Sequence, residues 1–203
     1  MNKITIVGLN GSPHIAGTTA NLLKKFLKSC EKSGANAKLL NLVEYNIKPC
    51  VGCYSKNPKL CKYPCNQKDD MQKIYPILFE ADALIFGTPV YWFNMSGLMK
   101  NFVDRLCCLA TEGYLLEGKV GVSLSASKEN EGGRFNASLS IASALNHLGL
   151  LIPPYSIMFY PGKEKVVKKG KAVWDKWILS EEKKIAKNLI NLCSFLKKEK
   201  FKW

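Results

Sequence analysis

The sequence predicts a doubly wound α/β protein, in which a five-stranded parallel sheet carries helices on both faces. Strand-like and helix-like patterns alternate along the chain of 203 residues, as they do in successive βαβ units. The expected strands are apolar along nearly their full length, which is typical of strands buried on both faces. The length fits one domain of this kind, and we expect residues 1–203 to form it.

The first part of the chain predicts two strands and one helix. β-Forming residues indicate a strand over residues 3–9, which stops at a Gly-Ser-Pro sequence. Apolar residues at helical spacing indicate a helix over residues 18–33, which Gly34 ends. A second strand fits residues 37–42. The stretch at about 45–68 is rich in proline and cysteine, and we expect it to be an irregular insertion.

The second part of the chain alternates more regularly. Helices are expected over residues 69–80, 96–109 and 135–148, and strands over residues 83–87, 119–125 and 150–158. A basic tail from about residue 171 is expected to form one or two helices. Their apolar residues make one stripe, which more often packs on its own domain than on a partner.

Five parallel strands are the number found in flavodoxin-like sheets, whose strand order is usually 2-1-3-4-5. Ligands bind such sheets beyond the carboxyl ends of the strands, at the point where the strand order reverses. The loops after the first, third and fourth strands should therefore meet. These loops hold residues 11–19, 88–95 and 125–133.

The first of these loops has the composition of a phosphate-binding turn. Its small residues let the backbone approach an anion, and the following helix start offers unpaired N–H groups and a partial positive charge. Ser12, Thr18 and Thr19 add hydroxyl donors. The loop has neither the dinucleotide fingerprint nor the Gly-Lys-Ser/Thr ending of an NTPase loop, so we expect a single terminal phosphate. The alternative is an ordinary turn with Thr18 as N-cap.

The second loop carries the consecutive aromatic residues Tyr91, Trp92 and Phe93. Three aromatics at the exposed end of a strand would form an apolar surface patch unless something covers them. A flat heteroaromatic ring would do so, and Pro89 would stiffen the loop. The alternative is packing against the protein itself or a second subunit, and we expect this of Phe93.

Several stretches together resemble the NAD(P)H-dependent FMN reductase family. They are Gly11-Ser12-Pro13, Gly17-Thr18-Thr19, Pro89-Val90-Tyr91-Trp92 and Met99–Arg105. Within that family, the iron-sulfur flavoprotein branch has a pattern similar to two further stretches, Pro49–Cys53 and Asp69-Asp70-Met71. The resemblance implies a noncovalently bound FMN.

The resemblance also implies which residues bind this FMN. They are Ser12, His14, Gly17, Thr18 and Thr19 around the phosphate, Pro89, Val90, Tyr91, Trp92 and Asn94 around the ring, and Ala126, Ser127 and Gly133 at the other ring edge. His14 stands where the family commonly has Arg, and Thr18 where it usually has Asn. Lys100 and Arg105 lie within a helix, where we expect a structural or subunit-interface role.

The eight cysteines divide into two groups. One group lies in helical patterns, where we expect buried small hydrophobic residues: Cys30, Cys107, Cys108 and Cys193. The other group lies close together in one polar stretch: Cys50, Cys53, Cys61 and Cys65. This second group has the spacing C-x2-C-x7-C-x3-C, with Lys56 where the branch has its third cysteine. Three states are open: a [4Fe–4S] cluster on the four thiolates, a structural zinc ion, and thiols without metal.

Composition limits the environment of the protein. No apolar run approaches the length that spans a bilayer and no signal peptide is recognisable, so we expect a cytoplasmic protein without membrane contact. The net charge is +14, and residues 163–203 carry thirteen Lys against five acids. This charge suits phosphorylated cofactors or acidic partners, although a solvated helix face is the simpler explanation. No nucleic-acid-binding motif accompanies it.

The leading functional hypothesis is a flavin-dependent oxidoreductase whose donor is NAD(P)H or a reduced ferredoxin-like carrier and whose acceptor is a small molecule. No catalytic side chain is expected, because the flavin itself accepts and donates electrons. The alternatives are an iron-sulfur flavoprotein that carries electrons between proteins, and a flavodoxin-like module that senses redox state. The family resemblance implies a homodimer or homotetramer.

Overall fold

The computed structural model describes residues 3–127, 133–161, 166–168, 171–173 and 176–199. Five strands form one parallel sheet: β1 (Thr5–Asn10), β2 (Asn36–Asn41), β3 (Ala83–Tyr91), β5 (Val120–Ser127) and β6 (Ile157–Pro161). Their order is β2-β1-β3-β5-β6, which confirms the predicted 2-1-3-4-5 arrangement. The two-residue strand β4 (Asn94–Met95) adds an antiparallel pairing to the end of β3.

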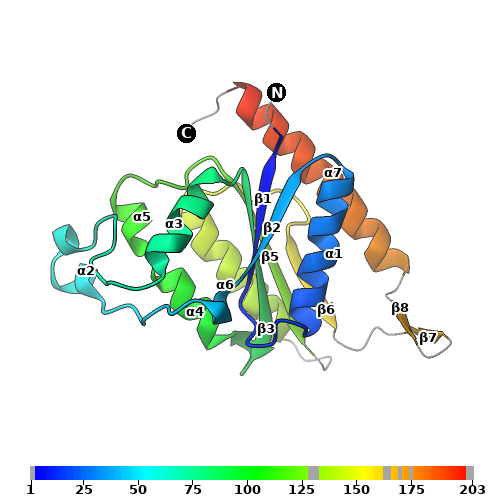
Figure 1. The fold of residues 1–203 in the computed structure, drawn as a ribbon, viewed down its shortest axis with the longest axis horizontal. Coiled ribbons are helices and arrows are strands. Elements are labelled where there is room, and N and C mark those ends of the chain that lie inside the picture. Colours follow the sequence, from blue (N-terminus) through cyan, green and yellow to red (C-terminus); the bar gives the residue numbers. More distant parts are fainter. Residues whose placement is uncertain (1–2, 128–132, 162–165, 169–170, 174–175, 200–203) are drawn as a thin grey trace.

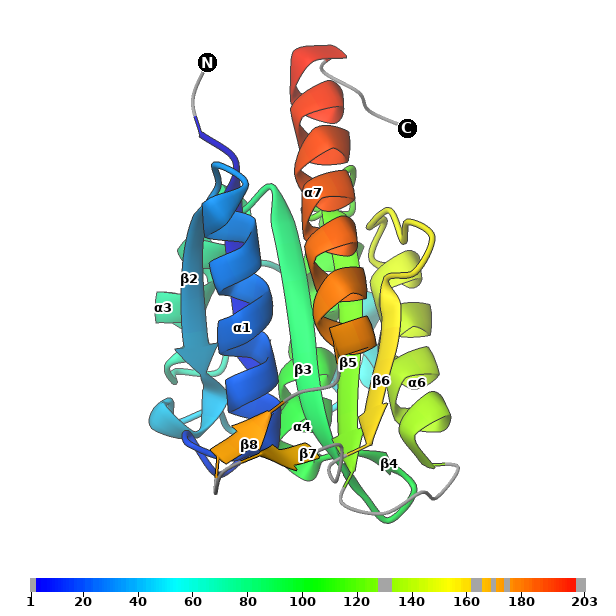
Figure 2. The same cartoon turned by 90° about the vertical axis from the view of Figure 1, so that its right-hand side faces the viewer.

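Helices cover both faces of the sheet (Figure 1). The long helices α1 (Thr18–Lys32) and α7 (Lys176–Glu199) lie side by side on one face, as Figure 2 shows. The other face carries α3 (Met71–Glu80), α4 (Gly97–Asp104), α5 (Cys107–Thr111) and α6 (Gly133–His147). Each layer has its own buried apolar cluster, so the inner strands β1, β3 and β5 are buried on both sides, as their continuous apolar character predicted, whereas the edge strands β2 and β6 are partly exposed.

Three predicted elements differ from the structure. The helix expected over 96–109 is broken at Arg105-Leu106 into α4 and α5. The strand expected over 150–158 starts only at Ile157, after Pro153-Pro154, because proline has no N–H to donate to a neighbouring strand. The tail begins not as a helix but as a small antiparallel pair, β7 (Val166–Lys168) with β8 (Lys171–Val173).

The irregular stretch before α3 contains only short helical turns, at Leu42–Glu44, Cys53–Lys56 (α2) and Pro58–Leu60. This agrees with the insertion expected there. Within the described ranges, no helix is both long enough and apolar enough to cross a membrane.

Helix α7 buries a carboxyl group. Glu182 is only 1% exposed, and its Oε1 has no hydrogen-bond partner among the described residues. Burial raises the pKa of Glu182 to about 7, although the positive charge of Lys25 on α1 opposes this. A buried carboxyl group with this pKa is neutral in weakly acidic solution and must ionise against its surroundings as the pH rises.

Glu182→Gln should therefore change the pH dependence of folding. The pKa of Glu182 is higher in the folded chain than its ordinary value of 4.5, so the stabilising contribution of the protonated group is complete below pH 4.5 and is lost as the pH rises through about 7. Urea unfolding should show Glu182→Gln gaining roughly 2–3 kcal/mol on the wild type between about pH 4.5 and about pH 8. Glu199→Gln, an exposed change on the same helix, is the control and should show no such gain. A constant difference across this range would contradict the burial argument.

Candidate functional site

The described residues of the three loops that were predicted to meet lie together at the carboxyl edge of the sheet. Asn10 at the end of β1 pairs with Gly87 of β3, and the next N–H, of Gly11, donates to the Gly87 carbonyl at 2.8 Å. Pro89 of β3 pairs with Ala126 of β5. The parallel register therefore brings the ends of β1, β3 and β5, from which the three loops start, to the lower edge of the sheet in Figure 1.

Two buried hydroxyl groups, of Ser96 and Thr88, join the first loop to the second. The Ser96 hydroxyl donates to the Gly11 carbonyl at 2.6 Å and, as N-cap of α4, accepts the N–H of Met99 at 3.1 Å. The Thr88 hydroxyl accepts the N–H of Ser96 at 2.9 Å. The sequence predicted that a helix starts at Ser96, but not that its hydroxyl joins the two loops. The signal for its capping role is a serine that directly precedes an apolar helical pattern.

Gly11 is required at this junction by the close approach of α4. A Cβ atom on Gly11 would lie 2.7 Å from the Cβ of Met99 and 3.2 Å from the Gly87 carbonyl oxygen. Neither backbone can retreat without breaking the hydrogen bonds just described. The first loop therefore sits directly against the start of α4.

The start of α1 keeps the features expected of an anion site. Gly17 is the N-cap, not Thr18, and among the described residues no side chain caps the helix and no acidic residue lies in its first turn. Ser12 and Thr19 are buried beside it, whereas His14 and Thr18 are exposed. The Ser12 Oγ accepts the N–H of His14 at 3.1 Å, which leaves its own proton to donate to a ligand.

The aromatic loop is the tight turn of the β3–β4 hairpin. Tyr91 pairs with Asn94, and the two residues between them, Trp92 and Phe93, have φ values of 46° and 62°. A two-residue turn with positive φ at both positions normally uses Asn or Gly. Bulky residues are strained in this conformation, and such strain is concentrated at functional sites.

The hairpin presents its aromatic side chains to the outside. Trp92 is 95% exposed, Phe93 55% and Tyr91 44%. Phe93 was expected to pack against the protein itself or a second subunit. Its ring is largely exposed on this chain, so only its backbone packs here, and packing on a second subunit stays a prediction. A Cβ atom on Gly133 would lie 2.7 Å from the Cα of Phe93, so Gly133 allows the start of α6 to support the turn.

The third loop is partly described. Ala126 is buried and Ser127 half-buried at the end of β5, and the buried Ser125 hydroxyl donates to the Arg134 carbonyl at 2.7 Å. Gly133 opens α6 against the hairpin. Residues 128–132 of the predicted loop lie outside the described residues.

Arg105 holds both ends of the cysteine loop, as we call residues 48–69. Its guanidinium donates to the Lys48 carbonyl at 2.7 Å and to Asp69 Oδ1 at 3.2 Å, and it forms an ion pair with the other oxygen of Asp69. It also donates to the Cys65 sulfur at 3.4 Å. The structural role expected for Arg105 is thus its observed one, whereas Lys100 makes an exposed ion pair with Asp104.

The buried pair keeps Asp69 ionised. Burial opposes the charge of Asp69, but hydrogen bonds from Arg105 and from the N–H groups of Lys48 and Met71 outweigh it and lower the pKa of the carboxyl group. Both side chains of the pair are fully buried, so each charge depends on the other for compensation.

The four clustered cysteines are not gathered around one point. Cys50 is exposed, Cys53 and Cys65 are half-buried, and Cys61 is buried. No three His, Cys, Asp or Glu side chains in the described ranges are arranged to hold a metal ion. Burial, together with the neighbouring thiols of Cys107 on α5 and of Cys53, raises the pKa of Cys61 to about 12. Cys107 was predicted to be a buried hydrophobic residue and is instead half-buried beside the loop.

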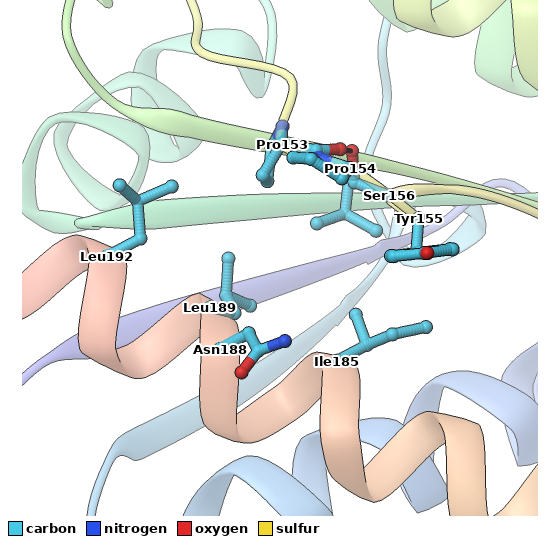
Figure 3. A pocket seen from close by; sticks show the side chains of 9 residues that line it. Pro153, Pro154, Tyr155, Ser156, Ile185, Asn188, Leu189 and Leu192 are labelled. Carbon is cyan, nitrogen blue, oxygen red and sulfur yellow. Dashed lines mark hydrogen bonds between the residues drawn. The ribbon is translucent and has the colours of Figure 1, made fainter.

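A separate cavity of about 360 Å³ lies on the α7 side of the sheet (Figure 3). Residues 153–156 form one wall and Ile185, Leu189 and Leu192 of α7 the other, with the Asn188 amide between them. The Ser156 carbonyl accepts the N–H of Ser123, early in β5. The cavity therefore lies toward the amino ends of the strands, away from the three converging loops.

The comparison with known proteins identifies the family. The sequence profile described as NADPH-dependent FMN reductase matches residues 4–161. The chain belongs to the NADPH-dependent FMN reductase family. It is a flavin-dependent oxidoreductase of the iron-sulfur flavoprotein branch, as the sequence motifs predicted.

Relatives of this FMN reductase include iron-sulfur flavoproteins from two organisms. One, from Archaeoglobus fulgidus, is 31% identical over 95% of the chain and 96% of its own length. Another, from Clostridioides difficile, is 30% identical over 94% of the chain and 86% of its own length. Matches to some other archaeal iron-sulfur flavoproteins cover between 52% and 65% of those proteins.

Other similar proteins are named as quinone-reducing enzymes, one a relative in sequence and one a solved structure. An NAD(P)H dehydrogenase (quinone) from Trichlorobacter lovleyi is 31% identical over 75% of the chain and 71% of its own length. An NAD(P)H:quinone oxidoreductase from Methanothermobacter marburgensis superposes with a TM-score of 0.70 at 16% identity, over 93% of this chain and 96% of that one. At this identity the likeness supports the fold alone.

Replacing Arg105 should destabilise the protein far more than replacing its neighbour Lys100. Arg105→Gln leaves the buried Asp69 carboxylate without its partner, and we expect the free energy of unfolding to fall by about 3–5 kcal/mol. Lys100→Gln breaks an exposed pair within α4, which ends next to Arg105, and should cost about 1 kcal/mol or less. Urea denaturation of both variants measures the difference. Equal losses would show that the Arg105 pair does not hold the loop.

Proposed function

We propose that the three converging loops bind FMN and that the protein transfers electrons from NAD(P)H to a small-molecule acceptor. The observation that carries this proposal is the uncapped start of α1 beside buried hydroxyl groups, at the same edge of the sheet as the aromatic hairpin. An anion and a flat ring separated by a short polar chain would satisfy both features. FMN has this composition, and the family is one of FMN reductases.

The residues present fit the phosphate of FMN. The first N–H groups of α1 have no partner within the helix, and the partial positive charge there favours an anion. Ser12 and Thr19, both under 5% exposed, lie where they can donate to the same group. Thr18 and His14 are exposed at the rim of the loop and are proposed as weaker contacts.

The hairpin and the third loop fit the ring. Backbone groups of residues 89–92 and the Asn94 side chain would meet its polar edge, and Ala126, Ser127 and Gly133 would lie at its other edge. Bound here, FMN would supply the hydride and electron chemistry of the enzyme. The protein's part is to orient the ring and to leave one face open to the second substrate, and no side chain is required as a general base.

The exposed aromatic turn also suits a second subunit. Trp92, at 95% exposure, is a large apolar surface on a two-residue turn, and such surfaces mark interaction sites. We propose that the enzyme is a homodimer or homotetramer in which a partner subunit covers this turn.

An electron carrier with an iron-sulfur cluster is the second candidate, and the names of the relatives favour it. In that case a ferredoxin-like protein would be a suitable donor and a protein the acceptor. The proposed ligands, Cys50, Cys53, Cys61 and Cys65, do not fit a [4Fe–4S] cluster or a zinc ion as they lie, because no three His, Cys, Asp or Glu side chains of the described residues are arranged to hold a metal ion. We therefore place no step of the reaction on a metal centre.

Ser12→Asp should expel FMN. A carboxylate at this buried position would face the phosphate and repel it, so we expect FMN affinity to fall on the order of 100-fold. Ser12→Ala removes one donor only and should weaken binding by about tenfold. Ser143→Asp, which adds the same charge at an exposed position on α6, should leave FMN affinity unchanged. Flavin fluorescence quenching measures all three, and full FMN retention by Ser12→Asp would contradict the phosphate assignment.

Steady-state oxidation of NADH and NADPH, with a quinone or free flavin as acceptor, separates the two functions. The reductase hypothesis predicts multiple turnovers with at least one nicotinamide by the FMN-loaded wild type and little activity by Ser12→Asp. If neither nicotinamide reduces the bound flavin but reduced ferredoxin does, the reductase hypothesis is wrong and the protein is an electron carrier.

A further inference from the structure

The cavity on the α7 side of the sheet takes no part in the proposed flavin site, and the strand pairing explains why it exists. Strand β6 begins at Ile157, which pairs with Ser123 of β5. The pairing before it is a single bridge of Leu151 with Val120. Five residues, 152–156, therefore lie opposite only two residues of β5. Because this stretch contains two prolines, which cannot pair through an N–H, the chain leaves the sheet here and a space of about 360 Å³ remains beside α7.

The turn Pro153–Ser156 is a fixed wall of this cavity. The Ser156 N–H donates to the Pro153 carbonyl at 3.2 Å, and the Ser156 hydroxyl donates to the same carbonyl. The Ser156 carbonyl in turn accepts the N–H of Ser123 at 2.9 Å. These bonds, together with the fixed φ of proline, hold the turn in one conformation. The cavity is therefore preformed, as sites for small molecules usually are.

Tyr155 occupies the turn position that usually belongs to glycine. It follows Pro154 with a φ of 65°, as does the third residue of a type II turn, where Gly or Asn is favoured. Its ring is not buried in exchange, because Tyr155 is 70% exposed. Figure 3 shows this ring at the cavity, facing the α7 side. A strained residue that packs little on its own chain is typical of positions that hold a ligand.

The interior of the cavity is apolar, and a cation lies at its exposed rim. Aliphatic side chains of β5 and α7 line the interior, namely Val122, Ile185, Leu189 and Leu192. At the rim, the Lys184 ammonium lies 5.8 Å from the centroid of the Tyr155 ring. The Asn188 amide lies between the two walls. Among the residues that the structure describes, no Asp or Glu lines the cavity, so its charge favours an anion.

We propose that this cavity is a second binding site, which takes a small aromatic carboxylate. The aromatic body packs between the Pro153–Ser156 turn and α7, and Lys184 and the Asn188 amide donate to the carboxylate at the rim. The size fits, because an apolar cavity of about 150 Å³ holds benzene and the space here is about 360 Å³. One ammonium group matches one negative charge. The site lies away from the flavin loops, so this inference does not rest on the proposed function.

Titration calorimetry with 2-naphthoate tests this site on the full-length protein, with excess FMN present to keep the probe from the proposed flavin site. The wild type should bind one equivalent with a dissociation constant of about 1 mM or lower, as expected for a molecule of this size. The neutral analogue 2-naphthylmethanol should bind about tenfold more weakly, because it lacks the charge that Lys184 compensates.

Two variants separate recognition of the charge from recognition of the ring. Lys184→Gln should weaken 2-naphthoate binding about tenfold and leave 2-naphthylmethanol binding unchanged. Lys38→Gln, the control, removes the same charge from an exposed position on β2 at the opposite edge of the sheet and should change neither. Tyr155→Gly should weaken binding of both compounds without lowering the thermal midpoint, because glycine adopts the positive φ of this turn without strain.

Filling the cavity locates the bound compound. Ile185→Trp should abolish 2-naphthoate binding and leave FMN affinity at the wild-type level, and Leu192→Trp serves the same purpose if the first variant does not fold. A wild type without saturable 2-naphthoate binding up to about 10 mM, or with equal affinity for both compounds, would overturn the proposal. Full binding by a folded Ile185→Trp or Leu192→Trp variant would also overturn it, since the compound would then occupy another site.

Discussion

The hydrogen bond from the Ser96 hydroxyl to the Gly11 carbonyl is the contact on which the rest of the site depends. It joins residues that are far apart in the chain, and it works only because Gly11 lets α4 approach closely. Ser96 also caps α4 and is oriented by Thr88. One buried hydroxyl thus sets the first loop, the second loop and a helix relative to one another, and a preorganised site on rigid elements follows from this.

The second constraint is electrostatic: it is the buried ion pair of Arg105 with Asp69, beside α4 and α5. Arg105 lies where the helical run breaks between α4 and α5, and its guanidinium satisfies groups at both ends of the cysteine loop. Such a buried ion pair contributes little net stability compared with apolar packing, yet removing one partner strongly lowers the free energy of unfolding because the other charge stays buried without compensation. Its effect is to specify one arrangement of an otherwise irregular segment against α4 and α5.

Much of the fold was predictable because the sheet is encoded locally. Alternating strand and helix patterns predicted five parallel strands, and the order usual for such a sheet is the observed one; the register then brings the ends of β1, β3 and β5 together. The positive φ of Trp92 and Phe93 was not predictable, since these residues are rare in such turns. Nor was the contact of α5 with the cysteine loop, where the Thr111 hydroxyl donates to the Cys61 carbonyl, because helical periodicity identifies a buried face but not which distant loop lies at its edge. The roles of the individual flavin-binding residues remain predictions.

The β3–β4 turn has a consequence for how this protein would respond to selection. Trp92 and Phe93 occupy a backbone conformation that Asn-Gly would adopt with less strain, so the chain gives up conformational free energy to display two aromatic rings there. A laboratory search for heat-resistant variants would accordingly tend to replace this pair and remove the apolar surface with it. Thermal robustness and molecular recognition thus make opposite demands on the same two residues.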